Sequence, residues 1–276
     1  MKKSFERAQR RREEGHGYKH DLGQNFLYDD ALLEELVQST GVTKADSVLE
    51  IGPGSGMLTK HLCPHAGKVL AVEVDHDIIP FLKVNTAAFS NLKIVEGDIR
   101  KQNLRELCAP LGENFLVIAN IPYNITTPIF EALWESGLSI RQISVMIQKE
   151  VAEKLMAAPS TAAYGLMSVK CQYYCTPRLE CIVPAEKFTP PPKVDSAFVH
   201  LEMSRCRSTE VQNERRLFSL LRAGFNLRRK TLSNALRSVV EPDALRAAME
   251  QAEISPTARA EELSVDDWIR LSNACP

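Results

Sequence analysis

The 276-residue sequence lacks a long apolar run, a paired-cysteine motif and any large net charge. Its first residues, MKKSFERAQRRREEGHGYKHD, are charged throughout, and no apolar run reaches the length of a bilayer-spanning helix, so neither a signal peptide nor a membrane span is expected. The seven cysteines form no C-x-x-C pair, which favours reduced thiols over a disulfide framework or a zinc site. We therefore expect a cytoplasmic protein with no membrane partner.

A metal centre is not predicted either. His61, Cys63 and His65 alternate along the chain, as some metal ligands do, but they fall where a helix is expected to end. An exposed turn is the favoured interpretation of these three residues. Catalytic groups must therefore be sought elsewhere.

The formal net charge of −1 hides an uneven distribution of charged side chains. Residues 1–20 hold seven basic side chains against three acidic ones, and residues 203–237 hold nine against two. The tail after residue 240 is acidic instead. Such segregation is typical of a polyanion-binding surface, and a solvated protein face is the alternative.

Short apolar runs alternate with amphipathic segments along the first two thirds of the chain. Runs without polar alternation indicate buried parallel strands, which we predict at 47–52, 69–74, 92–98, 115–120 and 143–148. One helix, capped by Asp29 and Asp30 and ended by Gly41, is predicted before the first strand, and others are predicted between the strands, the last capped by Thr126 or Thr127. Two more strands, at 178–183 and 196–203, precede a region with only helical patterns.

This order predicts an α/β fold in which a Rossmann-like, doubly wound domain is followed by a small C-terminal all-helical domain. The expected boundaries are a basic N-terminal tail over 1–20, the Rossmann-like domain over 21–205 and the helical domain over 206–276.

Successive strands end in residues suited to bind a nucleoside. The first ends in a loop containing Gly52 and Gly54, where glycine permits a tight turn and the close approach of a ligand. Glu73 ends the second strand, where a carboxylate can accept hydrogen bonds from both ribose hydroxyls. Asp98 ends the third predicted strand and can accept a hydrogen bond from the adenine amine. The alternative for the glycines is a structural strand-to-helix turn.

The ligand indicated by this pattern is S-adenosylmethionine. The dinucleotide fingerprint G-x-G-x-x-G is incomplete, because Met57 occupies its last position. A ligand without phosphates, held by two carboxylates, fits better than NAD. An NAD-dependent oxidoreductase remains an alternative, but it gives no role to Asp98 or to the turn that ends the fourth strand.

That turn, Asn120-Ile121-Pro122-Tyr123, carries the candidate chemistry. The adenine amine is a poor nucleophile because its lone pair is delocalised into the ring. The side-chain oxygen of Asn120 and the carbonyl of Pro122 can accept its two hydrogens, aim the lone pair at a methyl group and stabilise the developing cation. Tyr123 offers a face on which an extruded base can stack. A helix-capping Asn-Pro turn is the structural alternative.

These motifs, with others along the chain, form a recognisable set: DLGQNFL, EIGPGSGMLT, EVD, EGDI, NIPY, VMIQKEVAEKLMAAPSTAAYG, FTPPPKVDSAF and FNLRRKTLSNAL. Together they resemble the ribosomal RNA adenine N6-dimethyltransferase family, specifically the bacterial small-subunit enzymes whose loss gives kasugamycin resistance. The resemblance implies S-adenosylmethionine-dependent dimethylation of N6 of two adjacent adenosines in the 3′-terminal hairpin of 16S rRNA. It also implies action late in small-subunit biogenesis, on an immature 30S subunit, and we expect a monomer.

The resemblance assigns site residues as well. The family's cofactor site corresponds here to Gln24, Asn25, Leu27, Gly52, Gly54, Glu73, Asp98, Ile99 and Asn120. Its catalytic residues correspond to Asn120, Pro122, Tyr123 and Phe188, the last packing against the target base, with an ordinary core phenylalanine as the alternative. Arg228, Arg229 and Lys230 are expected to begin a helix and bind RNA phosphates without reading sequence.

The chain departs from the family pattern in two places. His20 and Asp21 stand where the family usually has a Lys-Ser pair, which removes a candidate phosphate contact, and Ile121 replaces a commoner leucine. Two other functions stay open: a non-catalytic RNA-binding assembly factor that keeps the cofactor scaffold, and an erythromycin-resistance methylase that acts on the large subunit.

Overall fold

The computed structural model describes residues 25–203 and 210–276, which divide into two compact units. The first unit extends to Lys149 and includes Leu179–Leu201, whereas the second comprises Glu150–Arg178 and the chain from Glu202 onward. Residues 150–178 thus belong with the C-terminal helices and not with the Rossmann-like domain in which the sequence analysis placed them. No helix within the described ranges is long and apolar enough to cross a bilayer.

The sheet of the first unit confirms the predicted α/β fold. Its seven strands are β2 (Ser47–Ile51), β3 (Lys68–Glu73), β4 (Leu92–Glu96), β5 (Phe115–Asn120), β6 (Ile140–Gln148), β7 (Cys175–Val183) and β9 (Ser196–Met203). They lie in the order β4-β3-β2-β5-β6-β9-β7, and the pairs β4–β3, β3–β2, β2–β5 and β5–β6 are parallel. The order reverses between β2 and β5, which is where ligands bind in folds of this class.

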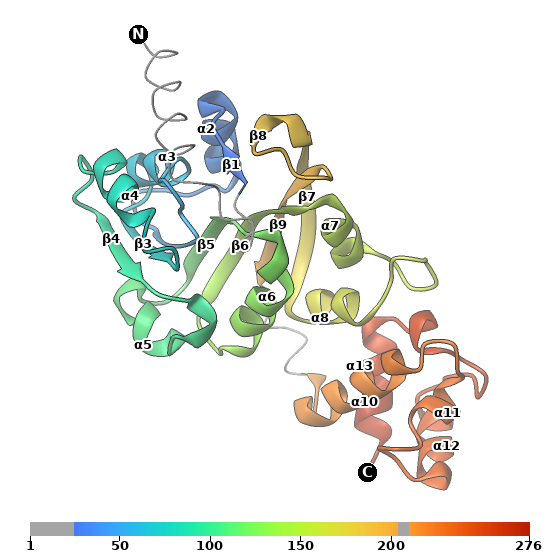
Figure 1. Ribbon diagram of the computed structural model, residues 1–276. Helices are drawn as coiled ribbons and strands as arrows, with labels where there is room; N and C mark the ends of the chain where they lie inside the picture. Colours follow the sequence, from blue (N-terminus) through green and yellow to red (C-terminus); the bar gives the residue numbers. More distant parts are fainter. Residues whose placement is uncertain (1–24, 204–209) are drawn as a thin grey trace. The chain divides into compact units, whose positions relative to one another are not determined.

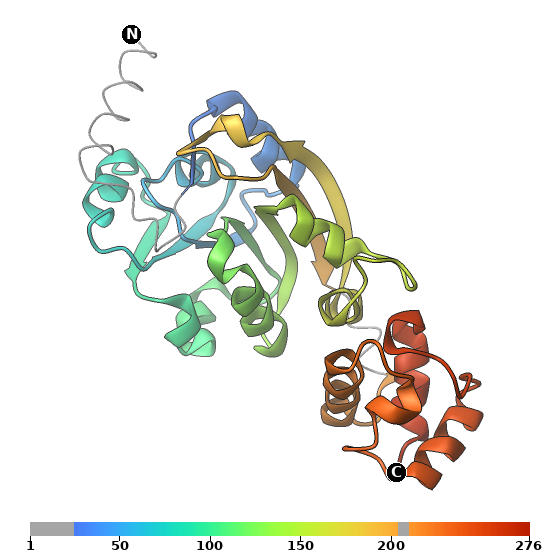
Figure 2. The same ribbon diagram turned by 45° about the vertical axis from the view of Figure 1, so that its right-hand side comes forward.

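Helices cover the sheet on both sides (Figures 1 and 2). They are α2 (Asp30–Ser39), α3 (Thr59–His65), α4 (Ile79–Asn85), α5 (Leu104–Cys108) and α6 (Thr126–Glu135). Leu36 and Leu62, from α2 and α3, share a buried cluster with Val48 and Ile118 of the strands. In the figures α5 and α6 lie on the opposite side of the strands from α2.

The caps of two helices test the predicted starts. Asp29 caps α2 as expected, accepting a hydrogen bond from the Leu32 N–H at 3.2 Å. The predicted cap of α6 is wrong, because a 3₁₀ turn at Tyr123–Ile125 leads straight into the helix, with Ile125 as N-cap. The hydroxyl of Thr126 donates back to the carbonyls of Pro122 and Tyr123, both at 3.3 Å.

A short antiparallel pair joins two distant motifs in the first unit. Strand β1 (Phe26–Leu27) pairs with β8 (Phe188–Thr189), so that Leu27 lies opposite Phe188. The segment NFL is thereby fixed to the segment FTPPPKV, which local sequence patterns do not predict.

The second unit has its own core. Its helices are α7 (Lys149–Met156), which begins at the boundary, α8 (Leu166–Tyr174), α10 (Glu214–Asn226), α11 (Leu232–Ala235), α12 (Pro242–Gln251) and α13 (Val265–Ala274). Tyr164 and Trp268 are fully buried in one cluster with Leu221. The Tyr164 hydroxyl donates to the Leu263 carbonyl at 2.8 Å, which explains why the segment before α8 packs with the C-terminal helices.

Candidate active site

The carboxyl ends of β2, β3 and β5 and the turn after β4 border a cavity of about 330 Å³ in the first unit. Its volume is within the usual range of small-molecule sites. The structure brings together these predicted site residues in its lining: Asn25, Leu27, Gly52, Gly54, Glu73, Asp98, Ile99, Asn120, Pro122 and Tyr123. Gln24 lies outside the described residues.

The glycine loop and Glu73 are locked to each other. Gly54 has φ +57°, and a Cβ there would lie 2.7 Å from the Phe26 ring, so both conformation and packing require glycine. Its N–H donates to Glu73 Oε2 at 2.9 Å, and the Asp75 N–H donates to Oε1 at 2.8 Å. The loop amide of Gly54 is therefore engaged by a carboxylate and is not presented to a pyrophosphate, which weighs against a dinucleotide.

A second buried carboxyl in the lining, Glu50, was given no role by the sequence analysis. It is 1% exposed, and neither of its oxygens has a hydrogen-bond partner among the described residues. Burial raises the pKa of Glu50 to about 8, the nearby Thr59 hydroxyl acts in the opposite direction, and the charge of Glu73 adds a smaller upward contribution. Burial also raises the pKa of Glu73, although its backbone hydrogen bonds act in the opposite direction. A carboxyl one residue before the end of a buried strand that leads into a glycine loop is the sequence signal that could have identified Glu50.

Asp98 is held by its neighbour Arg100. The guanidinium Nε lies 2.9 Å from Oδ1 and Nη2 lies 2.7 Å from Oδ2, and the Arg100 N–H donates to Oδ1 at 3.0 Å. These hydrogen bonds hold the pKa of Asp98 below its usual value. Asp98 is therefore a preset acceptor at the rim, beside the buried Ile99.

The turn after β5 presents an oriented amide. Asn120 Nδ2 donates to the Asn25 carbonyl at 3.0 Å, and this leaves Oδ1 as the acceptor that the side chain can offer to a ligand. The carbonyl of Pro122 accepts from the Ile125 N–H at 3.2 Å as well as from the hydroxyl of Thr126. Of the two groups predicted to accept a hydrogen bond from the target amine, the Pro122 carbonyl already accepts two hydrogen bonds, so Asn120 Oδ1 is the more available acceptor.

Tyr123, next in the turn, lines the cavity with its phenol anchored. Its hydroxyl makes a hydrogen bond with Oγ of Ser196, the fully buried first residue of β9. Burial raises the pKa of Tyr123. The phenol is therefore neutral at physiological pH, which suits a stacking surface and not a general base.

Comparison with known proteins agrees with this geometry. Residues 15–275 match the family described as Ribosomal RNA adenine dimethylase. The chain belongs to this family. A relative named Ribosomal RNA small subunit methyltransferase A from Lachnoclostridium phytofermentans is 39% identical over 93% of this chain and 91% of its own length. The protein of the same name from Streptococcus sanguinis is 41% identical, over 95% and 93%.

Two solved structures of related enzymes share the fold. A dimethyladenosine transferase from Plasmodium falciparum is 27% identical with a TM-score of 0.72, covering 89% of this chain and 95% of that one. The 23S rRNA methyltransferase ErmE is 25% identical with a TM-score of 0.68, covering 91% and 99%. The chain is therefore a methyltransferase with a Rossmann-like α/β domain, and the recognition made from its motifs is confirmed.

Phe188, a predicted catalytic residue, does not border the cavity. It is 2% exposed, lies opposite Leu27 in the β1–β8 pair and packs in the same buried cluster as Val183 and Phe198. In this structure the side chain packs in the core beside β1. It stabilises the segment that supplies Asn25 to the site.

The predicted RNA-binding residues lie in the second unit and do not begin a helix. Helix α10 ends at Asn226, so Arg228, Arg229 and Lys230 occupy the turn before α11. Arg228 forms an ion pair with Glu261 and donates to the Ala162 carbonyl at 3.1 Å. Arg229 and Lys230 are exposed, and the described residues include no ion-pair partner for either.

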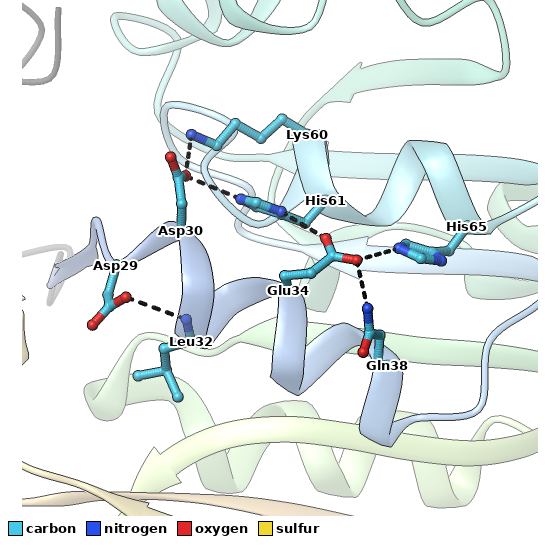
Figure 3. A network of polar contacts seen from close by, with 8 residues as sticks. All are labelled: Asp29, Asp30, Leu32, Glu34, Gln38, Lys60, His61 and His65. Carbon is cyan, nitrogen blue, oxygen red and sulfur yellow. Dashed lines mark hydrogen bonds and ion pairs between the residues drawn. The ribbon is translucent and has the colours of Figure 1, made fainter. Parts of the chain in front are cut away.

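The histidines that raised the question of a metal site serve another purpose (Figure 3). His61 lies between two carboxylates of α2, with Nδ1 3.0 Å from Glu34 and Nε2 3.1 Å from Asp30. His65 Nε2 lies 2.7 Å from the other oxygen of Glu34. Cys63 is buried. Within the described ranges no cluster of potential ligands is arranged to hold a metal ion, and the histidines instead tie α3 to α2.

Proposed function

We propose that this chain transfers methyl groups from S-adenosylmethionine to N6 of two adjacent adenosines in the 3′-terminal hairpin of 16S rRNA, dimethylating both. The observation that carries the proposal is the junction of a nucleoside-sized cavity with the oriented Asn120 amide. Family membership supports methyl transfer to ribosomal RNA adenine. The choice of the small subunit is supported by identities of 37–41% to relatives named for it, against 25% to ErmE.

The residues of the cavity fit an adenosyl cofactor. Glu73 keeps lone pairs for ribose hydroxyls after accepting two backbone N–H groups. Asp98 is ionised and placed to accept from the adenine amine, and the buried Ile99 supplies an apolar contact for the ring. The partnerless carboxyl of Glu50 would meet the cationic part of the cofactor. When bound, S-adenosylmethionine supplies an electrophilic methyl group.

The turn after β5 performs the chemistry on the target base. Asn120 Oδ1 accepts one hydrogen of the adenine amine, which turns the nitrogen lone pair toward the methyl group and stabilises the positive charge as it forms. The second acceptor comes from the turn's backbone. Among the described residues no hydrogen bond to the Ile121 carbonyl is found, whereas the Pro122 carbonyl already accepts two, so we favour Ile121. Tyr123 stacks on the extruded base and sets its plane.

Contacts with RNA phosphates come from exposed basic side chains of the second unit. Arg215 and Arg222 are exposed and seven residues apart on α10, so they lie on one face of the helix, and Arg229 and Lys230 follow in the next turn. Phosphate contacts of this kind position a nucleic acid without specifying its sequence and weaken as salt is raised. Arg228 is engaged by Glu261 and has a mainly structural role.

We also propose the setting in which the enzyme acts. The substrate is 16S rRNA within an immature 30S subunit, the enzyme acts in the cytoplasm as a monomer, and no metal takes part. The names of the curated relatives support the small subunit as the target.

Tritiated methyl transfer from S-adenosylmethionine tests the proposal. Immature 30S particles from a strain that lacks the modification and unmodified 50S subunits are compared as substrates, with Asn120→Ala as the inactive control. Label in 16S rRNA is expected from the unaltered protein only. Label in 50S subunits alone would identify a large-subunit methylase. Tight binding to 30S without any label would identify an assembly factor.

A further inference from the structure

The phenol of Tyr123 is held from outside the catalytic turn. Its partner, Ser196, lies 73 residues later in the chain, within the motif FTPPPKVDSAF, and the sequence analysis gave it no role. Ser196 is fully buried, whereas Tyr123 is partly exposed and lines the cavity. The hydrogen bond therefore connects the sheet interior to the surface on which the target base is to stack.

Ser196 is itself rigidly placed. It is the first residue of β9, which neighbours β6 in the sheet. The residue before it, Asp195, accepts hydrogen bonds from the Lys149 N–H at 3.0 Å through its carbonyl and from the Ala185 N–H at 3.1 Å through Oδ1. Hydrogen bonds thus join the segments around Lys149, Ala185 and Asp195 just before the serine, and they hold its hydroxyl in place.

The turn that carries Tyr123 is short. It is a single 3₁₀ turn, Tyr123–Ile125, at the open end of β5. The side chain of Tyr123 rotates about χ1, and the hydrogen bond between its hydroxyl and Ser196 restrains that rotation. Anchoring both the Cα and the phenol oxygen fixes the direction in which the ring projects into the cavity.

We propose that Ser196 is a positioning residue for methyl transfer, holding the Tyr123 phenol so that the stacked adenine is aligned with the methyl donor. This rests on the proposed function. In-line displacement depends steeply on alignment, so a loosened stacking surface lowers the rate of the chemical step more than it lowers binding. Ser196 touches neither cofactor nor base and acts only through Tyr123.

The test compares Ser196→Ala with Tyr123→Phe, which removes the same hydrogen bond from the other side and keeps the ring. The matched control is Ser144→Ala on β6, because Ser144 is also fully buried but pairs with His200 at 2.8 Å. Ser196→Ala should lower kcat about 10-fold. The dissociation constant for S-adenosylmethionine and the KM for 30S particles should stay within about twofold. Ser144→Ala should change thermal stability without changing kcat.

A double variant separates positioning from general damage. If loss of the hydrogen bond between the two hydroxyls causes the lower kcat, the double variant Ser196→Ala with Tyr123→Phe is no slower than the slower single variant. The reason is that both substitutions remove the same interaction. Multiplied losses would overturn the proposal. So would an unchanged kcat in Ser196→Ala, or a loss confined to KM or thermal stability.

A spectroscopic measurement tests the contact independently of methyl transfer. In protein labelled with ¹³Cζ-tyrosine, the resonance missing from Tyr123→Phe belongs to Tyr123. It should shift in Ser196→Ala and stay in place in Ser144→Ala. An unmoved resonance overturns the proposal even if the enzyme is active. No methyl transfer by the unaltered protein, with the shift present, would refute the proposed function and the positioning role of Ser196 while leaving the contact established.

Discussion

Replacing Glu50 by glutamine should change how the stability of the cofactor-free protein depends on pH. Glu50 is 1% exposed with no hydrogen-bond partner among the described residues, and its pKa is raised from 4.5 to about 8. The folded protein therefore keeps a proton that the unfolded chain has already lost. Because the folded state binds more protons, its stability falls as pH rises from about 4.5 to about 8.

The loss of folding stability can be calculated from this pH range. At pH 7 the difference from the unfolded pKa is 7 − 4.5 = 2.5 units, which corresponds to an upper limit of about 3.4 kcal/mol at roughly 1.36 kcal/mol per unit. Glutamine is nearly the same size and carries no titrating proton. The advantage of Glu50→Gln over the unaltered protein should thus grow steadily between pH 5 and pH 7.

Urea unfolding of both proteins at pH 5, 6 and 7 measures this difference. Glu96→Gln, at the exposed end of β4, is the matched control and should give parallel curves. Curves for Glu50→Gln that also run parallel to those of the unaltered protein would refute the reasoning. Binding of the cationic cofactor should ionise Glu50, so titration calorimetry in two buffers at pH 7 should show proton release that Glu50→Gln lacks.

Further predictions concern the site and its surroundings. Asn120→Ala should reduce methyl transfer at least about 10²-fold with an unchanged cofactor dissociation constant by calorimetry, and normal turnover would exclude Asn120 from the mechanism. Glu73→Ala should instead weaken cofactor binding in the same assay, and an unaltered constant would contradict the ribose assignment. Arg229→Ala should weaken 30S binding and lower its salt slope by about 1, whereas an unchanged slope would remove it from the phosphate contacts. Hydrogen bonds from the α3 histidines lower the pKa of Glu34 to about 2. Glu34 therefore stabilises the fold above about pH 4.5, and this stabilisation is lost as pH falls toward 2. Glu34→Gln should therefore flatten acid unfolding followed by circular dichroism, and an unflattened curve would argue against this network.

The strands and the position of the Asn120–Tyr123 turn at the cavity could be predicted because their signals are local. A buried apolar run such as 115–120 identifies both a strand and the residue at which it ends. Residues that follow the carboxyl ends of parallel strands lie together at one edge of the sheet. The carbonyl of Asn25 that orients Asn120 lies 95 residues away in sequence, and the hydroxyl that anchors Tyr123 lies 73 residues away. Such pairings depend on how β1 and β9 pack, which no local pattern encodes.

Two predicted site residues make contacts that the sequence does not reveal. Arg228 matched a basic motif, but only the fold shows that Glu261 pairs with it. Phe188 matched a family aromatic, but pairing of β8 with β1 buries it. A sequence motif identifies the residue type, whereas exposure and partners are set by tertiary packing.

The most direct test of the central claim is nucleoside mass spectrometry of 16S rRNA from immature 30S particles incubated with the protein and S-adenosylmethionine. We predict N6,N6-dimethyladenosine at two adjacent positions of the 3′-terminal hairpin, absent from particles treated with Asn120→Ala. Dimethyladenosine confined to 23S rRNA, or an unmodified 16S hairpin despite a bound cofactor, would contradict the account.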